Sequence, residues 1–433
     1  MPKKLILISD LHIGGEPDIE DFQCGAEFGA FVDHLLNTSF QFDLELIING
    51  DFFDLWKCYD QKDEKINYII AMHQNLFDKL KEFGNKNKIT VIPGNHDHEL
   101  VYNKKLQDDL KKYNINVDPN QFFKRELSKK NKKFIIIGEH GNQVEPASSF
   151  TDFYLPTESS LSYHVTTQFV YRLMRLGTKK KKPHWMHEVD NVDTDLIPYW
   201  LLSKYFYNEI GPILKSILVP MLILFSLAIP YFIFDIVTDF YQPRFLMPVI
   251  NFLDTNLIMK GIIFILYFDM VVVILLLFAS LLRKDFNKRL RGYGVQSLSD
   301  ILLSKQRSYK EKARDVINGL NPFNTKADLY ITGHTHCAVL HKEDNMFLAD
   351  TGSWKQLTKR VPAYFRFPPI FYPFYLLSYV EVYEQPENIT VELRAWPKPF
   401  TSRLTILEKI FIKRKKNVPE PILADTLIKT YSC

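Results

Sequence analysis

Aspartate, asparagine and histidine residues recur directly after short aliphatic runs in this chain of 433 residues. Such runs, rich in Ile, Leu and Val, are typical of central strands that are covered on both faces. The carboxyl ends of parallel strands share one edge of a sheet, where ligands bind. We therefore expect one such edge to gather the following side chains: Asp10, His12, Asp51, Asn95, His140, His334 and His336.

This set of side chains points to a metal centre. Carboxylate, amide and imidazole groups crowded together would repel or desolvate one another without a cation between them. Seven ligands are too many for one ion that keeps an open position, whereas two ions bridged by one carboxylate would use them all. Mixed oxygen and imidazole ligation predicts two divalent metal ions, with Mn²⁺ as the first choice and Fe, Zn or Co as alternatives.

The motifs that contain these residues resemble, as an ordered set, the calcineurin-like metallophosphoesterase superfamily. Each motif alone is a weak signal, because an Asp-x-His or Gly-His pair is more often structural than ligating. The resemblance covers about residues 1–142 and 327–396 and implies a four-layer αββα sandwich with phosphoesterase activity. The matching segments are "DLH" at 10–12, "GDFFD" at 50–54, "GNHD" at 94–97, "HG" at 140–141 and "GHTH" at 333–336.

The resemblance also implies roles for the site residues. The first metal would be held by Asp10, His12, Asp51 and His336, and the second by Asp51, Asn95, His140 and His334. His96 would stabilise or protonate the leaving oxygen, since an unperturbed pKa of about 6.5 suits a general acid near neutral pH. Asp97 would orient His96. The two ions would lower the pKa of a bridging water and steady the in-line transition state.

The elements that position these residues follow an alternating order. Helix-like apolar spacing at 22–36 and 66–83 separates strands expected at 4–9, 44–49, 88–93 and 133–138, which predicts an α/β layered fold. The next strand, at 327–332, follows after about 190 residues, so we expect an insertion. Late strands at 346–354, 375–383 and 389–396 would complete a second sheet on the first. The predicted domains are a first catalytic part at 1–150, a helical insertion at 151–303, a second catalytic part at 304–400 and a tail at 401–433.

Two apolar stretches within the insertion have the length of membrane-spanning helices. Residues 216–234 are uncharged and residues 261–282 are apolar except for Asp269, and a spanning helix needs about 20 residues. We predict a transmembrane hairpin with segments at about 213–237 and 261–282. The alternative is a pair of buried core helices, or a dimer interface, in a soluble protein.

The charges around this hairpin predict its orientation. Lys and Arg residues cluster outside the pair, whereas the connecting loop carries only Arg244 and Lys260. By the positive-inside tendency, both outer ends face the cytoplasm, which places the catalytic domain on the cytoplasmic side of a membrane. The aromatic run at 361–375 suits either a lipid interface or packing beneath the late strands.

The substrate class follows from a second resemblance. The segment "GDFFDLW" at 50–56 and the place of the insertion are similar to the UDP-2,3-diacylglucosamine diphosphatase group, which cleaves the pyrophosphate of a lipid A precursor. That group commonly has arginine at the position of His96, and its insertion is much smaller. A hairpin beside the site favours a phosphorylated, amphiphilic substrate, with membrane lipids as partners.

Two other function classes remain open. One is a general phosphodiesterase or nuclease that the hairpin merely tethers to the membrane, and the other is a non-enzymatic membrane scaffold. A net charge of +4 is weak evidence for a nucleic-acid partner, and the sequence has no basic groove signal with interleaved aromatic residues. The complete ligand set makes the scaffold the weaker of the two.

Overall fold

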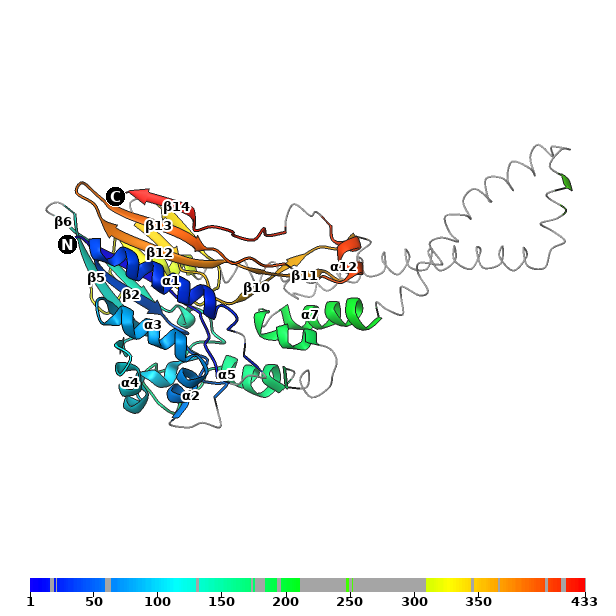
Figure 1. Ribbon diagram of the computed structural model, residues 1–433, viewed down its shortest axis with the longest axis horizontal. Helices are drawn as coiled ribbons and strands as arrows, with labels where there is room; N and C mark the ends of the chain where they lie inside the picture. Colours follow the sequence, from blue (N-terminus) through cyan, green and yellow to red (C-terminus); the bar gives the residue numbers. More distant parts are fainter. Residues whose placement is uncertain are drawn as a thin grey trace.

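The computed structural model describes a body with two sheets and the helices beside it. The described residues are 1–15, 19–20, 22–58, 64–129, 132–172, 174–175, 184–192, 196–210, 247–248, 251, 309–343, 346–364, 367–401, 404–413 and 418–432. Within them the strands form a seven-stranded sheet, a five-stranded sheet and a two-stranded ribbon (Figure 1).

The seven-stranded sheet has a parallel half and an antiparallel half. Strands β1 to β4 run parallel, and β12 pairs antiparallel with the other edge of β1, with Leu7 opposite Val380. In order across the sheet the strands are β14 (Thr426–Ser432), β13 (Ile389–Trp396), β12 (Leu377–Glu384), β1 (Lys3–Ile8), β2 (Asp43–Asn49), β3 (Lys88–Ile92) and β4 (Ile115–Val117).

The five-stranded sheet is built from both ends of the predicted catalytic domain. Strand β6 pairs parallel with β7, and β7 pairs parallel with β9, although about 190 residues separate β6 from β7. In order the strands are β5 (Phe122–Lys129), β6 (Lys132–Glu139), β7 (Leu329–Thr332), β9 (Met346–Asp350) and β8 (Val339–Glu343).

Alternation along the central strands builds two separate cores. On β1, Ile6 and Ile8 face the helices, whereas Leu5 and Leu7 face the second sheet, because successive side chains of a strand point to opposite faces. The helices on the first sheet are α1 (Gly25–Thr38), α2 (Lys65–Met72), α3 (Gln74–Gly84) and α4 (Lys104–Lys111), with the short turns η1 (Ser39–Gln41) and η3 (His98–Val101) in its loops. A further short turn, η4 (Asn142–Val144), follows β6.

A helix on the far side completes the layers. Helical residues 309–317 pack Val316 and Ile317 against Ile137 and Tyr330 on the outer face of the five-stranded sheet. The order helix, sheet, sheet, helix agrees with the predicted αββα sandwich. The two sheets share a dry core that includes Leu7.

Two sequence predictions about elements need correction. Of the late strands, only β9 joins the second sheet, while β12 and β13 extend the first, because the free edge of β1 accepts β12. The helix predicted at 66–83 is two helices, because the backbone leaves helical geometry at His73, where φ is −120° and ψ is 31°. Much of the aromatic run at 361–375 forms β11 (Ile370–Tyr375), which pairs with β10 (Gln356–Val361).

The described part of the insertion is helical and packs beside the ribbon β10–β11 (Figure 1). Trp185, Trp200 and Tyr171 are buried there in one cluster with Phe371 of β11. Its helices are α5 (Leu161–Val165), η5 (Thr166–Val170), η6 (His184–Asn191), α7 (Ile197–Lys204) and η8 (Tyr205–Ile210), and α12 (Ile406–Phe411) lies near the end of the ribbon.

Within the part of the chain that the structure describes, no helix is both long enough and apolar enough to span a membrane. The predicted segments at 213–237 and 261–282 lie outside the described residues.

Candidate metal centre

The predicted site residues lie on loops at the carboxyl ends of five strands. β1, β2 and β3 of the seven-stranded sheet and β6 and β7 of the five-stranded sheet all end there. The sequence led us to expect one sheet edge, whereas the site lies where the edges of two sheets meet. Backbone hydrogen bonds tie the loops together: Asp10 N donates to Gly50 O at 3.1 Å, and Gly333 N donates to His140 O at 2.8 Å.

Five of the seven predicted ligands have a left-handed backbone. Non-glycine residues avoid this region because Cβ approaches the following carbonyl oxygen, at a cost of about 1 to 2 kcal/mol per residue. Strain of this kind collects at functional sites, where the surrounding structure holds it. The φ values are +56° at Asp10, +51° at His12, +51° at Asp51, +66° at His334 and +57° at His336.

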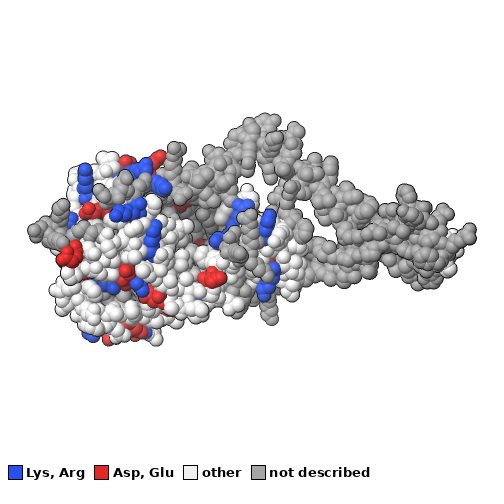
Figure 2. All heavy atoms as spheres, turned by 90° about the horizontal axis from the view of Figure 1, so that it is seen from above, with Lys and Arg blue, Asp and Glu red and all other residues white. Residues whose placement is uncertain are grey.

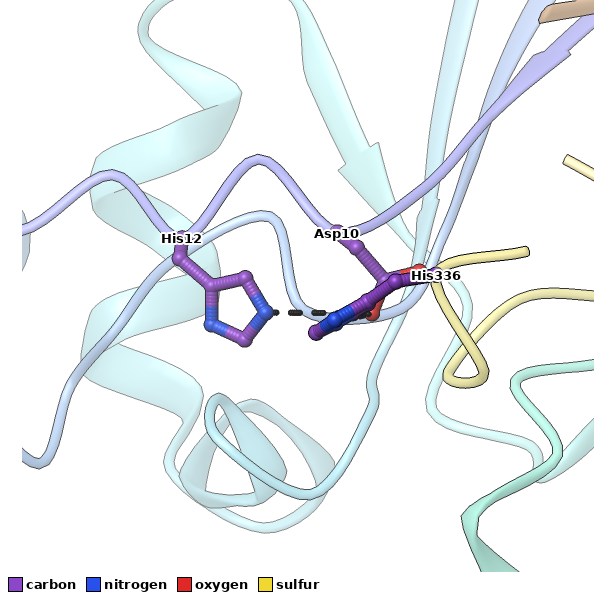
Figure 3. A group of neighbouring side chains, drawn as sticks. All are labelled: Asp10, His12 and His336. Carbon is purple, nitrogen blue, oxygen red and sulfur yellow. Dashed lines mark ion pairs between the residues drawn. The ribbon is translucent and has the colours of Figure 1, made fainter. Parts of the chain in front are cut away.

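One group of three ligand atoms forms around Asp10. Its Oδ1 lies 3.7 Å from His12 Nε2 and 3.2 Å from His336 Nε2. Figure 3 shows both rings turned toward this carboxylate. One nitrogen of each ring and one carboxylate oxygen lie within 4.8 Å of one another, which is close enough for a shared ion.

A second group forms around Asp51. Its Oδ2 lies 3.2 Å from His140 Nε2, and His334 completes the group. The same Oδ2 lies 3.7 Å from His12 Nε2, which belongs to the first group. The Asp51 carboxylate therefore lies between the two groups and within reach of both.

The buried ligand atoms fit bound cations. Asp10 Oδ1, His12 Nε2, Asn95 Oδ1 and His140 Nε2 are buried and have no hydrogen-bond partner among the described residues. A buried polar atom without a partner costs about 1 to 3 kcal/mol, so several in one place need a common explanation. Two divalent ions would satisfy these atoms, and oxygen with imidazole nitrogen is a donor set that such ions accept. Asn95 Oδ1 is buried and unpaired in the same way, and the next residue, His96, donates its backbone N–H to Asp51 Oδ1 at 2.8 Å.

Neighbouring groups fix which atom each ligand presents. His140 Nδ1 donates to the carbonyl oxygen of Asn49 at 3.0 Å, which leaves Nε2 for the site. His334 Nε2 lies 2.9 Å from Glu145 Oε2, which leaves Nδ1. Such outer contacts set the tautomer and orientation of metal-binding histidines. Glu145 belongs to none of the sequence motifs, and the sequence analysis missed it.

The electrostatic environment favours positive charge at the centre. Burial lowers the pKa of His140, but the carboxylates of Asp51 and Asp10 outweigh this effect and raise it to about 10. Burial lowers the pKa of His12 to about 4, so its ring is neutral and keeps a lone pair for a ligand bond. The negative charges of Asp51 and Asp10, which stabilise a proton on His140, would also stabilise a bound cation.

His96 forms a further group of possible ligands with His12 and Asp51, and Asp54 is the carboxylate that contacts its ring. His96 Nδ1 lies 3.1 Å from Asp54 Oδ1, and the His96 and His12 ring centroids are 4.5 Å apart. Burial lowers the pKa of His96, but the carboxylates of Asp54 and Asp51 outweigh this effect and raise it above its ordinary value.

The predicted role of Asp97 as the residue that orients His96 is therefore wrong. The Asp97 carboxylate instead accepts backbone N–H groups, from Gly94 at 2.6 Å and from Phe52 and Phe53 at 2.9 and 3.2 Å. Burial and the neighbouring Asp51 charge raise the pKa of Asp97 to about 7. Asp97 holds the loops after β2 and β3 together.

Comparison with known proteins agrees with this geometry. The family model described as calcineurin-like phosphoesterase matches residues 3–198. The search of curated proteins found no match.

Three solved structures are similar to the chain at low sequence identity, with TM-scores that are too low to carry an argument. A dimetal phosphatase from Danio rerio is 10% identical, with 94% of this chain and 100% of that chain covered and a TM-score of 0.32. A putative 5′-nucleotidase from Staphylococcus aureus is 13% identical, with 95% and 57% covered and a TM-score of 0.31. A predicted phosphoesterase from Streptococcus pneumoniae is 9% identical, with 94% and 98% covered and a TM-score of 0.26.

The family match begins at β1 and extends over the loops that carry Asp10, Asp51 and His140. Together with the loop after β7, which lies outside the matched residues, those loops assemble ligand groups that suit divalent metal ions. The match over residues 3–198 and these ligand groups support a calcineurin-like metallophosphoesterase assignment, and the chain is a metal-dependent phosphoester hydrolase.

Proposed function

We propose that the chain is a membrane-associated phosphoesterase with two metal ions, which hydrolyses a phosphoester or pyrophosphate bond of an amphiphilic substrate. The observation that carries the two-metal part is the position of Asp51. Its Oδ2 lies 3.7 Å from His12 and 3.2 Å from His140, and these histidines belong to different ligand groups.

Different residues of the chain would hold the metal ions and protonate the leaving group. When bound, the two ions supply a nucleophilic water and neutralise charge on the phosphoryl oxygens. Asp10, His12, Asp51 and His336 would hold the first ion, and Asp51, Asn95, His140 and His334 the second. His96 delivers a proton to the leaving oxygen from Nε2, because Nδ1 is engaged by Asp54.

The amphiphilic substrate is supported by the surface of the insertion. Helix α7 and the residue after it expose Tyr199, Leu202 and Tyr205, at 42, 53 and 54% of their surface. These apolar side chains lie on the last described helices before the two apolar sequence stretches at 213–237 and 261–282. Aromatic and aliphatic side chains in such a place suit the boundary between membrane and water.

The alternative function, a phosphodiesterase or nuclease tethered to the membrane, has less support from the surface charges. On the face seen in Figure 2, basic and acidic side chains of the described residues are interspersed. Binding to a nucleic-acid backbone favours a continuous basic stripe. A UDP-acyl-sugar, as in the diphosphatase group that "GDFFDLW" resembles, is the specific substrate that we propose to test first.

The test compares the full chain with a variant in which a short Gly-Ser linker replaces residues 211–291. Both are assayed with Mn²⁺ on UDP-2,3-diacylglucosamine, its deacylated analogue, an aryl phosphodiester and single-stranded DNA, and both are fractionated with membranes. The deletion starts after η8, because Tyr207 in that turn is buried and donates to the carbonyl oxygen of Pro368 at 2.9 Å.

We expect the full chain to sediment with membranes and to prefer the acylated nucleotide by about tenfold or more, a difference of about 1.4 kcal/mol. The deletion variant should be soluble, should lose the acyl preference and should still hydrolyse the aryl diester. Equal rates on acylated and deacylated substrates would contradict the substrate proposal. Continued sedimentation of the deletion variant would contradict the membrane proposal, and activity on the aryl diester tests the catalytic centre separately.

A further inference from the structure

A tyrosine of the inserted segment places its hydroxyl beside the catalytic centre. Tyr171 follows η5 directly, is 4% exposed, and places its hydroxyl 2.9 Å from Asp54 Oδ1 and 2.8 Å from Asp54 Oδ2. Asp54 is fully buried, and the same Oδ1 lies 3.1 Å from His96 Nδ1. A chain of contacts therefore runs from the insertion through Asp54 to His96.

A lysine on the other side of Asp54 is also tied to the insertion. Lys57 Nζ lies 3.2 Å from Asp54 Oδ2 and 3.2 Å from Asp190 Oδ2 of η6. The ammonium also lies 5.7 Å from the centroid of the Tyr171 ring. Two residues of the insertion, Tyr171 and Asp190, thus reach the group that holds His96, one directly and one through Lys57.

We infer that Tyr171 is a positioning residue for His96 and that the insertion thereby completes the catalytic centre. This inference rests on the proposed function, in which His96 protonates the leaving oxygen. The Asp54 carboxylate has two oxygens, one toward His96 and one toward Lys57, and the phenol is in contact with both. It fixes the plane of the carboxylate, and with it the direction of the His96 ring.

The face of the ring is fixed separately. Trp56 stacks on His96 with ring centroids 3.7 Å apart and planes at 26°. Trp56 restricts tilting of the ring, whereas Asp54 restricts its rotation within the plane. Loss of the Tyr171 hydroxyl should therefore leave the His96 ring stacked on Trp56 but allow the direction of its Nε2 to vary. A misaligned general acid lowers the reaction rate most for a poor leaving group, because such a group depends most on receiving a proton.

The test measures how the rate depends on the leaving group. The full-length wild type, Tyr171→Phe, His96→Gln and Tyr207→Phe are assayed with Mn²⁺ on methyl aryl phosphodiesters whose leaving groups range from 4-nitrophenol to phenol. Tyr207 is the matched control, because it is a buried tyrosine of the insertion whose hydroxyl bonds to a carbonyl oxygen away from the centre. Bound metal and Tm are measured for every variant.

With Tyr171→Phe we expect kcat to fall by about tenfold or more on the phenol ester and by less than about twofold on the 4-nitrophenol ester. KM and bound metal should stay within about twofold of wild type, and Tyr207→Phe should behave as wild type does. A uniform loss on all esters, or no loss on any, would overturn the inference. If His96→Gln also showed no added dependence on the leaving group, the acid role of His96 would fail, and the inference with it.

Discussion

At the residue scale, the centre depends on backbone conformations that side chains ordinarily avoid. Asp10, His12 and Asp51 all have a positive φ, and so do His334 and His336. Backbone hydrogen bonds hold them there by joining loops that follow strands of different sheets, such as Trp354 N after β9 to Asp10 O after β1, at 3.1 Å. The strain is therefore distributed over several loops, which together hold these five residues at the site.

Gly50 provides the clearest residue-scale prediction. Its φ is +88°, and a Cβ there would lie 2.1 Å from His140 Nδ1. Gly50→Ala should lower the free energy of unfolding by about 1 to 3 kcal/mol and displace His140. Thermal unfolding and bound metal measure the two effects. Gly25→Ala is the control, because the nearest atom to its added Cβ would be 3.7 Å away. This variant should leave stability and metal content unchanged or slightly improved. A Gly50→Ala protein with the same stability and metal content as Gly25→Ala would contradict the account.

The site residues carried by motifs could be predicted from sequence, but their partners could not. "GDFFD" and "GNHD" each offer a second aspartate, and only the folded geometry shows that Asp54, and not Asp97, contacts His96. Glu145 and Tyr171 have no local signal, because each acts on a residue that is distant in sequence. Chemistry that resides in a strand-end motif is visible in the sequence, whereas contacts between distant loops are not.

At the element scale, an ion pair joins the two sheets beside their shared core. Arg125 of β5 donates to Glu45 of β2 through Nε at 2.9 Å and through Nη2 at 2.8 Å. Thr90 of β3 donates to the same carboxylate at 2.7 Å. Burial raises the pKa of Glu45, but the Arg125 guanidinium outweighs this effect and lowers it below the ordinary value of 4.5.

This pair should stabilise the fold in a pH-dependent way. Because the folded-state pKa of Glu45 lies below the unfolded one, its contribution is complete above about pH 4.5 and is lost as pH falls through the folded-state pKa. A double-mutant cycle with Glu45→Gln and Arg125→Met should give a coupling of about 1 to 2 kcal/mol at pH 7 that shrinks below pH 4.5. Urea unfolding at both pH values measures it. A coupling that grew in acid would contradict the assignment.

The strands that could be predicted are those buried on both faces. β1, β2 and β3 are aliphatic runs, and each lies within one residue of its predicted bounds. β14 is exposed along almost its whole length, so it carries no apolar pattern and was missed. The sheet to which β12 belongs could not be predicted either, since a strand buried on both faces looks the same in either sheet.

At the scale of the whole molecule, three parts of the chain converge on one centre. The loops of β1 to β3 belong to the first sheet, those of β6 and β7 to the second, and Tyr171 comes from the insertion. Ions bound between the sheets would tie residues 1–142 to residues 327–396 and so stabilise the folded state by mass action. We propose that two such ions, shared through Asp51, carry the hydrolysis.

The measurement that tests this claim most directly is a metal titration of the chelator-treated protein. Bound Mn²⁺ per chain and hydrolysis of methyl 4-nitrophenyl phosphate are followed together for wild type, Asp51→Asn and Asp109→Asn. Asp109 is the control for the same chemical change, being a buried aspartate on α4 that pairs with Lys112 at 2.6 Å.

We predict that wild type and Asp109→Asn bind two ions per chain and reach full activity only with both. Asp51→Asn should lose at least one ion and about a thousandfold or more in rate. Hydrolysis by the metal-free wild type, saturation at a single ion, or an Asp51→Asn variant with full activity would contradict the account.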